Sequence, residues 1–200
     1  MTDRGAAESA VAEPSEVLAF WRAAGPEKWY TKDSDFDAEI TRRFLSTYEA
    51  AVAGRLSQWE DTPKGALALV IVLDQFPRNM FRGSARTFAA DALARAAADR
   101  AIGRGFDQQI AVSERQFLYI PFEHSENPAD QERSLALFRA NDDAEALKWA
   151  ELHADIIRRF GRFPHRNAML GRATTPAEQA FLDSGGLRAD APGSKRLRSG

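Results

Sequence analysis

Cysteine is absent from this chain of 200 residues. That absence excludes disulfides, thiolate nucleophiles, Cys-ligated zinc and iron–sulfur clusters, and it suits a reducing cytoplasm. An excess of charge of one sign is also lacking, because 27 Lys and Arg stand against 29 Asp and Glu and leave a formal net charge of -2. A nearly balanced chain has no broad field to attract nucleic acid or an anionic membrane, so we expect neither as a partner.

Long hydrophobic runs are lacking as well. The longest apolar run, residues 66–73, is far shorter than the roughly 18 residues that indicate a membrane span, and it is typical of a buried core helix. Residues 1–14 carry charged side chains such as Asp3, Arg4 and Glu8, and they contain no apolar stretch of the kind that a signal peptide needs. We therefore expect a cytoplasmic protein.

Alternating strand patterns are nearly absent, whereas apolar residues recur every three or four positions from Ser15 to Leu182. The sequence therefore predicts an all-α fold. Helices are expected at residues 15–24, 33–54, 63–76, 85–102, 113–120, 128–140, 144–160 and 176–182. Short connections between them favour a layered array of antiparallel helix pairs, with a bundle as the alternative, and no regular repeat of roughly 34 residues is present.

A chain of this length with 44% hydrophobic residues is expected to form one domain around one core. We predict a single helical domain over residues 15–183, a disordered segment over 1–14 and a disordered basic tail over 184–200. Two expected helix starts carry the pattern of a capping box, in which each side chain bonds a backbone amide at the other position. These pairs are Ser113 with Gln116, and Thr175 with Glu178.

An internal echo is the most informative pattern in the sequence. Residues 76–79 (FPRN) are followed by Gly83, and residues 163–167 (FPHRN) by Gly171, so a glycine lies four positions beyond the asparagine in both. Because each echo follows an apolar helix and contains proline, we expect two equivalent sharp corners at helix ends.

The arginines and asparagines of the two echoes have two compatible interpretations. Arg78, Asn79, Arg166 and Asn167 can satisfy the free carbonyls of helix ends. Alternatively, Arg78 and Arg166, with Arg82 and Arg172 nearby in sequence, converge on an anionic ligand whose oxygens match the guanidinium fork. We expect Arg78 and Arg166 to share one polar cavity with His124 or Glu126.

Further polar residues follow apolar segments, where a core would end. Asp74 and Gln75 end the most apolar helix, and we expect Asp74 to form an ion pair with Arg78, with a raised-pKa acid or base as the alternative. All three histidines lie in the second half: His124 within a crowded polar turn, His153 and His165. No spacing of the His-Glu-x-x-His type and no glycine-rich phosphate loop is present, so we expect no metal and no cofactor.

Four segments together resemble a known family: residues 17–21 (VLAFW), 74–83 (DQFPRNMFRG), 121–126 (PFEHSE) and 159–172 (RFGRFPHRNAMLGR). They are similar to the bacterial domain-of-unknown-function 924 family, and the similarity spans nearly the whole chain. The resemblance implies a right-handed, tetratricopeptide-like helical array without a regular sequence repeat. It implies no established activity, cofactor or catalytic residue.

These observations favour a helical binding module that takes an anionic small molecule or a peptide in a polar pocket. The expected ligand-binding residues are Asp74, Gln75, Arg78, Asn79, Arg82, His124, Glu126, His165, Arg166, Asn167 and Arg172. Two other hypotheses stay open. One is a hydrolase-type enzyme that uses His124 or His165 with Glu126 or Asp74. The other is a structural interaction protein in which these polar residues only serve the fold. The sequence does not determine the oligomeric state.

Overall fold

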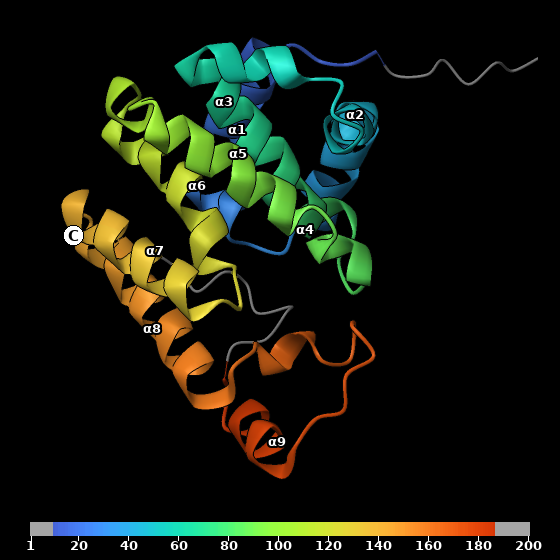
Figure 1. Cartoon of the computed structure of the whole chain (residues 1–200). Helices are drawn as coiled ribbons and strands as arrows, with labels where there is room; N and C mark the ends of the chain where they lie inside the picture. The colour runs from blue at the N-terminus through green and yellow to red at the C-terminus, as the bar shows by residue number, and fades with distance from the viewer. Residues whose placement is uncertain (1–9, 187–200) are drawn as a thin grey trace, which may run out of the picture.

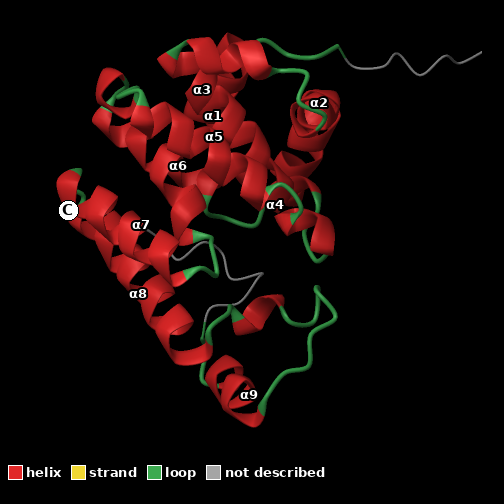
Figure 2. Ribbon diagram, viewed as in Figure 1, coloured by secondary structure: helices red, strands yellow, loops and turns green. Residues whose placement is uncertain are grey.

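A computed structural model describes residues 10–186 of the chain. Within that range every regular element is a helix and no strand occurs (Figure 2), so the predicted all-α class is confirmed. No helix among these residues has the length and apolar character needed to cross a membrane. The predicted disorder concerns segments that lie mostly outside the described residues, at 1–9 and 187–200.

The helices pack in layers (Figure 1). Their bounds are α1 (Pro14–Trp29), α2 (Ser34–Val52), α3 (Pro63–Val70), α4 (Phe76–Met80), α5 (Asp91–Gly103), α6 (Val112–Glu123), α7 (Pro128–Ala140), α8 (Ala144–Phe160) and α9 (Pro176–Asp183). Shorter turns are η1 (Ser57–Asp61), the π-helical η2 (Ile71–Gln75), η3 (Ala85–Phe88), η4 (Asp107–Gln109) and η5 (Pro164–Arg166). Helices α1 to α8 contribute to one main core, and the pair α7 and α8 joins it through contacts with α6.

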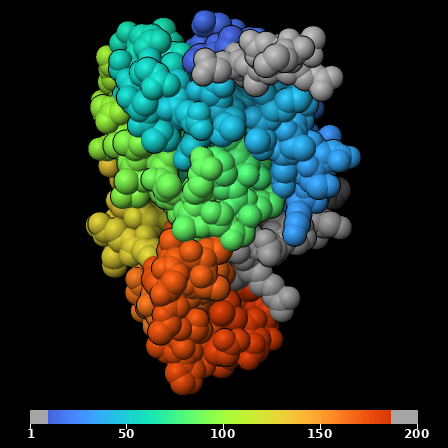
Figure 3. Space-filling model, turned by 90° about the vertical axis from the view of Figure 1, so that its right-hand side faces the viewer, coloured from blue at the N-terminus to red at the C-terminus, as the bar shows by residue number. Residues whose placement is uncertain are grey.

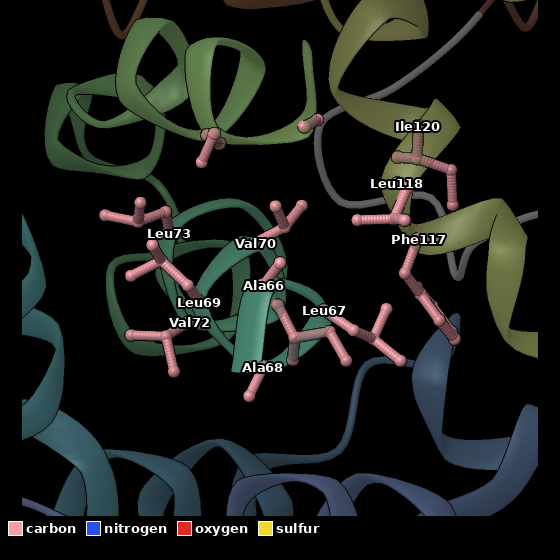
Figure 4. Packing of buried hydrophobic residues seen from close by; sticks show 14 of the residues in the cluster. Ala66, Leu67, Ala68, Leu69, Val70, Val72, Leu73, Phe117, Leu118 and Ile120 are labelled. Carbon is pink, nitrogen blue, oxygen red and sulfur yellow. The ribbon is translucent and has the colours of Figure 1, made fainter. Parts of the chain in front are cut away.

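Helix α3 occupies the centre of the core, as its uniformly apolar sequence predicts. The Thr62 side chain accepts the Gly65 amide at 3.1 Å, and Pro63 takes the first helical position, where its missing N–H costs nothing. Side chains leave α3 in opposite directions: Leu67 points toward Phe117 of α6, whereas Leu69 points to the other side (Figure 4). Helix α3 therefore contacts α1, α5 and α6.

A second, smaller apolar cluster lies near the end of the described chain. It contains Ile156, Ile157 and Phe163, with Phe160 and Phe181 packed against it. In Figure 3 this orange and red part of the chain sits against the green middle part. Polar contacts join the two parts, among them those of Arg166 with Asp91 and with the His124 carbonyl.

The two Phe-Pro echoes were predicted to be equivalent corners, and this prediction is wrong. At the first echo the chain stays helical: η2 widens by one residue, so that the Phe76 amide donates to the Ile71 carbonyl. The wider turn accommodates Pro77, which has no N–H to donate and whose ring would meet the preceding turn. Only the second echo is a sharp corner, because Gly161 adopts φ 68° and ends α8 before Pro164.

Three local predictions have mixed outcomes. The capping box of Thr175 and Glu178 is confirmed at the start of α9. The capping box at Ser113 is wrong, since α6 begins one residue earlier and the Gln116 side chain donates to the Ser113 carbonyl at 2.8 Å. The helix expected at 85–102 is also divided, because the 3-10 turn η3 ends before α5 starts at Asp91.

Candidate functional site

Arg78 and Arg166 contact the same carboxylate although 88 positions separate them in the sequence. Arg78 lies on α4 and Arg166 on η5, and both contact Asp91, the first residue of α5. Arg78 Nη2 lies 3.0 Å from Asp91 Oδ1, and Arg166 Nη1 lies 3.5 Å from Asp91 Oδ2. Arg166 Nη2 also donates to the backbone carbonyl of His124 at 3.0 Å. The two echoes therefore contribute to one polar cluster together with His124, whereas the shared ligand cavity stays a prediction.

The Arg166 guanidinium packs against two aromatic rings, and one of its nitrogens has no hydrogen-bond partner. Its guanidinium carbon lies 4.5 Å from the ring centres of both Phe88 and Phe163, and the residue is only 7% exposed. Its Nε is buried and has no hydrogen-bond partner. Burial, together with the nearby Arg78 charge, lowers the pKa of Arg166 to about 10 against the opposite effect of Asp91. Arg166 thus stays charged at neutral pH while one of its donors is unused.

Asp74 is the most buried charged residue of the cluster, with no exposed surface. Its Oδ1 lies 2.9 Å from His124 Nδ1 and 3.4 Å from Arg78 Nη1, and its Oδ2 accepts the Gln75 amide at 2.6 Å. Burial alone would raise the pKa of this carboxyl, but Arg78 and His124 outweigh burial and hold the pKa at about 2. The expected Asp74–Arg78 ion pair is present, and the alternative of a raised pKa is wrong.

His124 follows directly after α6 and faces the Asp74 carboxylate. Burial and the Arg78 charge lower the pKa of His124, although Asp74 acts in the opposite direction. A neutral imidazole beside an ionised carboxylate carries its proton on Nδ1, where it donates to Asp74. The lone pair is then on Nε2, which has no hydrogen-bond partner within residues 10–186 and is not among the nitrogens closed off from solvent.

The three histidines of the chain lie near one another, His153 and His165 beside Phe163 and His124 beside His153. The rings of His124 and His153 lie 6.4 Å apart, and those of His153 and His165 each lie 5.5 Å from the Phe163 ring. Burial and the Arg166 charge lower the pKa of His165 to about 3. Despite this gathering, the described part of the chain contains no group of three or more His, Asp or Glu arranged to hold a metal ion.

Glu126, Asn167 and Arg172 form a neighbouring clamp and do not contact Asp91. Arg172 binds both carboxylate oxygens of Glu126, at 2.7 and 3.0 Å, and its Nε donates to Asn167 Oδ1 at 3.0 Å. Glu126 also accepts the Phe163 amide at 2.8 Å. Every charge in this clamp is paired and the backbone at the corner after α8 is held on both sides. The geometry supports a structural role for these three residues.

Asn79 and Arg82 lie outside the cluster. The Asn79 amide donates to Asp37 Oδ1 at 2.7 Å, and Arg82 binds the same carboxylate through two nitrogens, which ties α4 to α2. Sequence reasoning also missed two members of the cluster, Asp91 and Phe88. Neither belongs to a motif, and only the packing of η3 and α5 against η5 brings them there.

A separate hollow of about 320 Å³ lies between α1 and α2. Its lining includes Phe20, Lys28, Phe36 and Glu39, and none of the residues predicted for ligand binding. It lacks the convergence of buried charges found around Asp91, so we take the arginine and histidine cluster as the candidate site.

Together, the fold and the cluster define an all-helical protein whose buried polar residues meet where several helices end. A family profile described as bacterial protein of unknown function (DUF924) matches residues 17–186. The chain belongs to this family, as its motifs indicate. It is also similar to the solved structure of a protein of unknown function from Agrobacterium tumefaciens, with 45% identity and a TM-score of 0.84 over 86% of this chain and 97% of that one. A comparison with curated proteins finds no match.

Proposed function

We propose that this protein binds a small anionic molecule, carrying a carboxylate or phosphate group, at Arg78 and Arg166. The observation that carries the proposal is the position of Asp91. Its carboxylate contacts both guanidiniums and so occupies the place that a ligand's anionic group would take. Two guanidinium forks on one carboxylate are a geometry suited to planar anionic oxygens.

The two arginines differ in how firmly they are held. Arg78 is engaged by Asp74 and Asp91 and also donates to the Asp74 carbonyl. Arg166 has only the 3.5 Å contact with Asp91, one carbonyl and an unpaired Nε. A buried donor without a partner costs roughly 1–3 kcal/mol, so a ligand oxygen that reaches it stabilises the complex. Arg166 is therefore the principal ligand contact.

The charges of the cluster also define how binding proceeds. Arg78 and Arg166 are balanced by Asp74 and Asp91, so an incoming anion competes with the Asp91 carboxylate. Asp91 lies 3.5 Å from Arg166 and 3.0 Å from Arg78, so the anion displaces Asp91 from Arg166 first. Because Arg166 is only 7% exposed, a compact anionic group fits this role better than the body of a peptide. A cytoplasmic location and a tetratricopeptide-like array stay predictions.

Isothermal titration calorimetry with inorganic phosphate and with succinate, at low ionic strength, tests the proposal. Asp91→Asn removes the competing charge and keeps the side-chain shape, so it should tighten anion binding by about tenfold or more, roughly 1.4 kcal/mol. Arg166→Lys keeps the charge but loses the fork, and it should weaken binding by a similar factor.

The matched control is Arg158→Lys, which alters an exposed arginine paired with Glu132 at 2.7 Å. It should leave both affinities unchanged, because exposed pairs contribute little. Unchanged affinity in Asp91→Asn and Arg166→Lys, with both variants folded by circular dichroism, would contradict the proposal. The cluster would then have a structural role only.

A further inference from the structure

The geometry points to catalysis in the same cluster: we infer that His124, positioned by Asp74, activates water for the hydrolysis of a small ester. The anionic acyl group that we assign to this ester rests on the binding proposed above. The catalytic role of His124 does not rest on that binding, because it depends on Asp74 and on the free Nε2.

The Asp74 carboxylate is fixed in a way that orients the imidazole. It is fully buried on η2, its Oδ2 is held by Gln75 and its Oδ1 is shared between Arg78 and His124. With both oxygens engaged, the carboxylate cannot rotate away from His124 Nδ1. The π-helical turn contributes to this placement, since widening the helix at Pro77 sets the position of Asp74.

The remaining nitrogen of His124 is available for chemistry. The side chain is 16% exposed, and within the described residues nothing hydrogen-bonds to Nε2. A histidine that only satisfied Asp74 would gain nothing from an open Nε2. His165 differs, since its Nδ1 is buried without a partner. His153 also has its Nδ1 near a carboxylate, 3.0 Å from Glu123 Oε1, but this nitrogen lies closer, at 2.8 Å, to the Trp149 carbonyl oxygen. We therefore assign the base to His124, whose Nδ1 has the Asp74 carboxylate as its one partner within the described residues.

Charged and titratable groups face His124 from every element packed around it. They are Asp74 from η2, Arg78 from α4, Asp91 from α5, His153 from α8, and His165 and Arg166 from η5. Glu123, the last residue of α6, contacts His153 at 3.0 Å. The cationic Arg78 disfavours a proton on Nε2, whereas Asp74 holds the proton on Nδ1 and stabilises the imidazolium when it forms. The imidazole is thus a free base at neutral pH.

The proposed reaction balances as follows. Nε2 removes one proton from a water molecule while the water oxygen bonds to the ester carbonyl carbon, giving a tetrahedral anion and an imidazolium. When the carbon–oxygen bond to the alcohol breaks, the imidazolium returns the proton to the departing alkoxide. One ester and one water become one carboxylic acid and one alcohol. Arg166 holds the anionic end of the acyl group, and His124 is the catalytic residue.

Two chromogenic esters test the inference separately from the proposed binding: p-nitrophenyl acetate, which is neutral, and mono-p-nitrophenyl succinate, which carries a carboxylate. The full chain should hydrolyse both faster than buffer alone. Because the carboxylate of the succinate ester already accelerates its own hydrolysis in buffer, each rate is divided by its buffer rate, and this ratio should be larger for the succinate ester than for the acetate. His124→Gln should reduce both rates by about 100-fold or more, to near the buffer rate, as expected for loss of a general base. The control His153→Gln keeps a side chain that can donate to Glu123 or Trp149, and its rates should stay within about twofold of the parent rates.

The positioning role of Asp74 has a readout that a structural role would not move. In the parent protein the rate should fall on acidification with a midpoint below the ordinary histidine value of 6.5. In folded Asp74→Asn the lost carboxylate should move the midpoint further down and lower the plateau rate by at least about tenfold. If Asp74→Asn does not fold, diethyl pyrocarbonate modification of the parent protein replaces it, and loss of activity should follow acylation of the peptide containing His124.

Each result bears on one inference. Full activity in folded His124→Gln, no hydrolysis above buffer by the parent protein, or activity that survives complete acylation of His124 would each overturn the catalytic inference. Such results leave anion binding intact. Equal acceleration of both esters over their buffer rates, with loss in His124→Gln, supports the catalytic role of His124 and counts against the anionic acyl group.

Discussion

Replacing Arg78 by methionine tests whether the buried Asp74 carboxylate depends on this one cation. Methionine is unbranched and keeps an apolar stem like that of arginine, but it removes the guanidinium with its charge and its donors. Asp74 has no exposed surface and Arg78 lies 3.4 Å from it. Removing one partner of a buried ion pair leaves the other charge uncompensated, so we expect a loss of about 3–5 kcal/mol in the free energy of unfolding at neutral pH.

The pH dependence of this loss follows from the pKa of Asp74. In the native protein it falls from 3.8 to about 2, which corresponds to about 2 kcal/mol of stabilisation. Because the native pKa is depressed, this stabilisation is present above 3.8 and is lost as the pH falls through about 2. Without Arg78, burial raises the pKa of Asp74, so the variant takes up a proton on Asp74 as the pH falls from neutral. The stability difference should therefore shrink toward pH 4.

Urea unfolding followed by circular dichroism at pH 7 and pH 4 measures this difference. A second variant, Arg78→Met with Asp74→Asn, removes both charges, and it should recover a large part of the loss because no buried charge is left unpaired. A loss below about 1 kcal/mol for Arg78→Met, or an equal loss at both pH values, would refute the reasoning. His124 and Gln75 would then be sufficient partners for the buried Asp74 carboxylate.

Two further predictions concern stability. The pKa of His165 is lowered to about 3, so each pH unit below the ordinary histidine value of 6.5 should cost the native state about 1.4 kcal/mol, because only the unfolded chain then takes up the proton. His165→Asn should therefore flatten the dependence of the urea-measured stability on pH between pH 6.5 and 5, and an unchanged slope would contradict this. Gly65→Ala should lower the melting temperature, by overpacking worth about 1–3 kcal/mol, since a Cβ there would lie 2.1 Å from the Trp59 carbonyl oxygen. Gly103→Ala is its control, because nothing lies within 4 Å of that position, and it should be neutral or slightly stabilising; equal melting temperatures in the two variants would argue against the close approach at Gly65.

The sequence contained a signal that separates two of the predicted ligand-binding residues from two others. Residues four apart share one face of a helix and adjacent residues do not. Asp74 and Arg78 are four apart and form an ion pair, whereas Asn79 and Arg82 are three apart and both bind Asp37 on another helix. Asp74 and Arg78 therefore belong to the candidate site, whereas Asn79 and Arg82 join α4 to α2.

What the sequence determined by itself is local. Apolar spacing fixes the helices and their approximate bounds, and Thr62, Pro63, Thr175 and Gly161 set helix starts and a stop, because these effects act over a few neighbouring residues. The tertiary structure decided which charged and titratable side chains lie together. Asp91 bridges the arginines of both echoes only because α4, α5 and η5 end at one place, and Asp74 becomes a stable buried anion only beside Arg78 and His124. The Coulomb and burial energies of these groups depend on distances between segments far apart in the chain, and no local pattern encodes those distances.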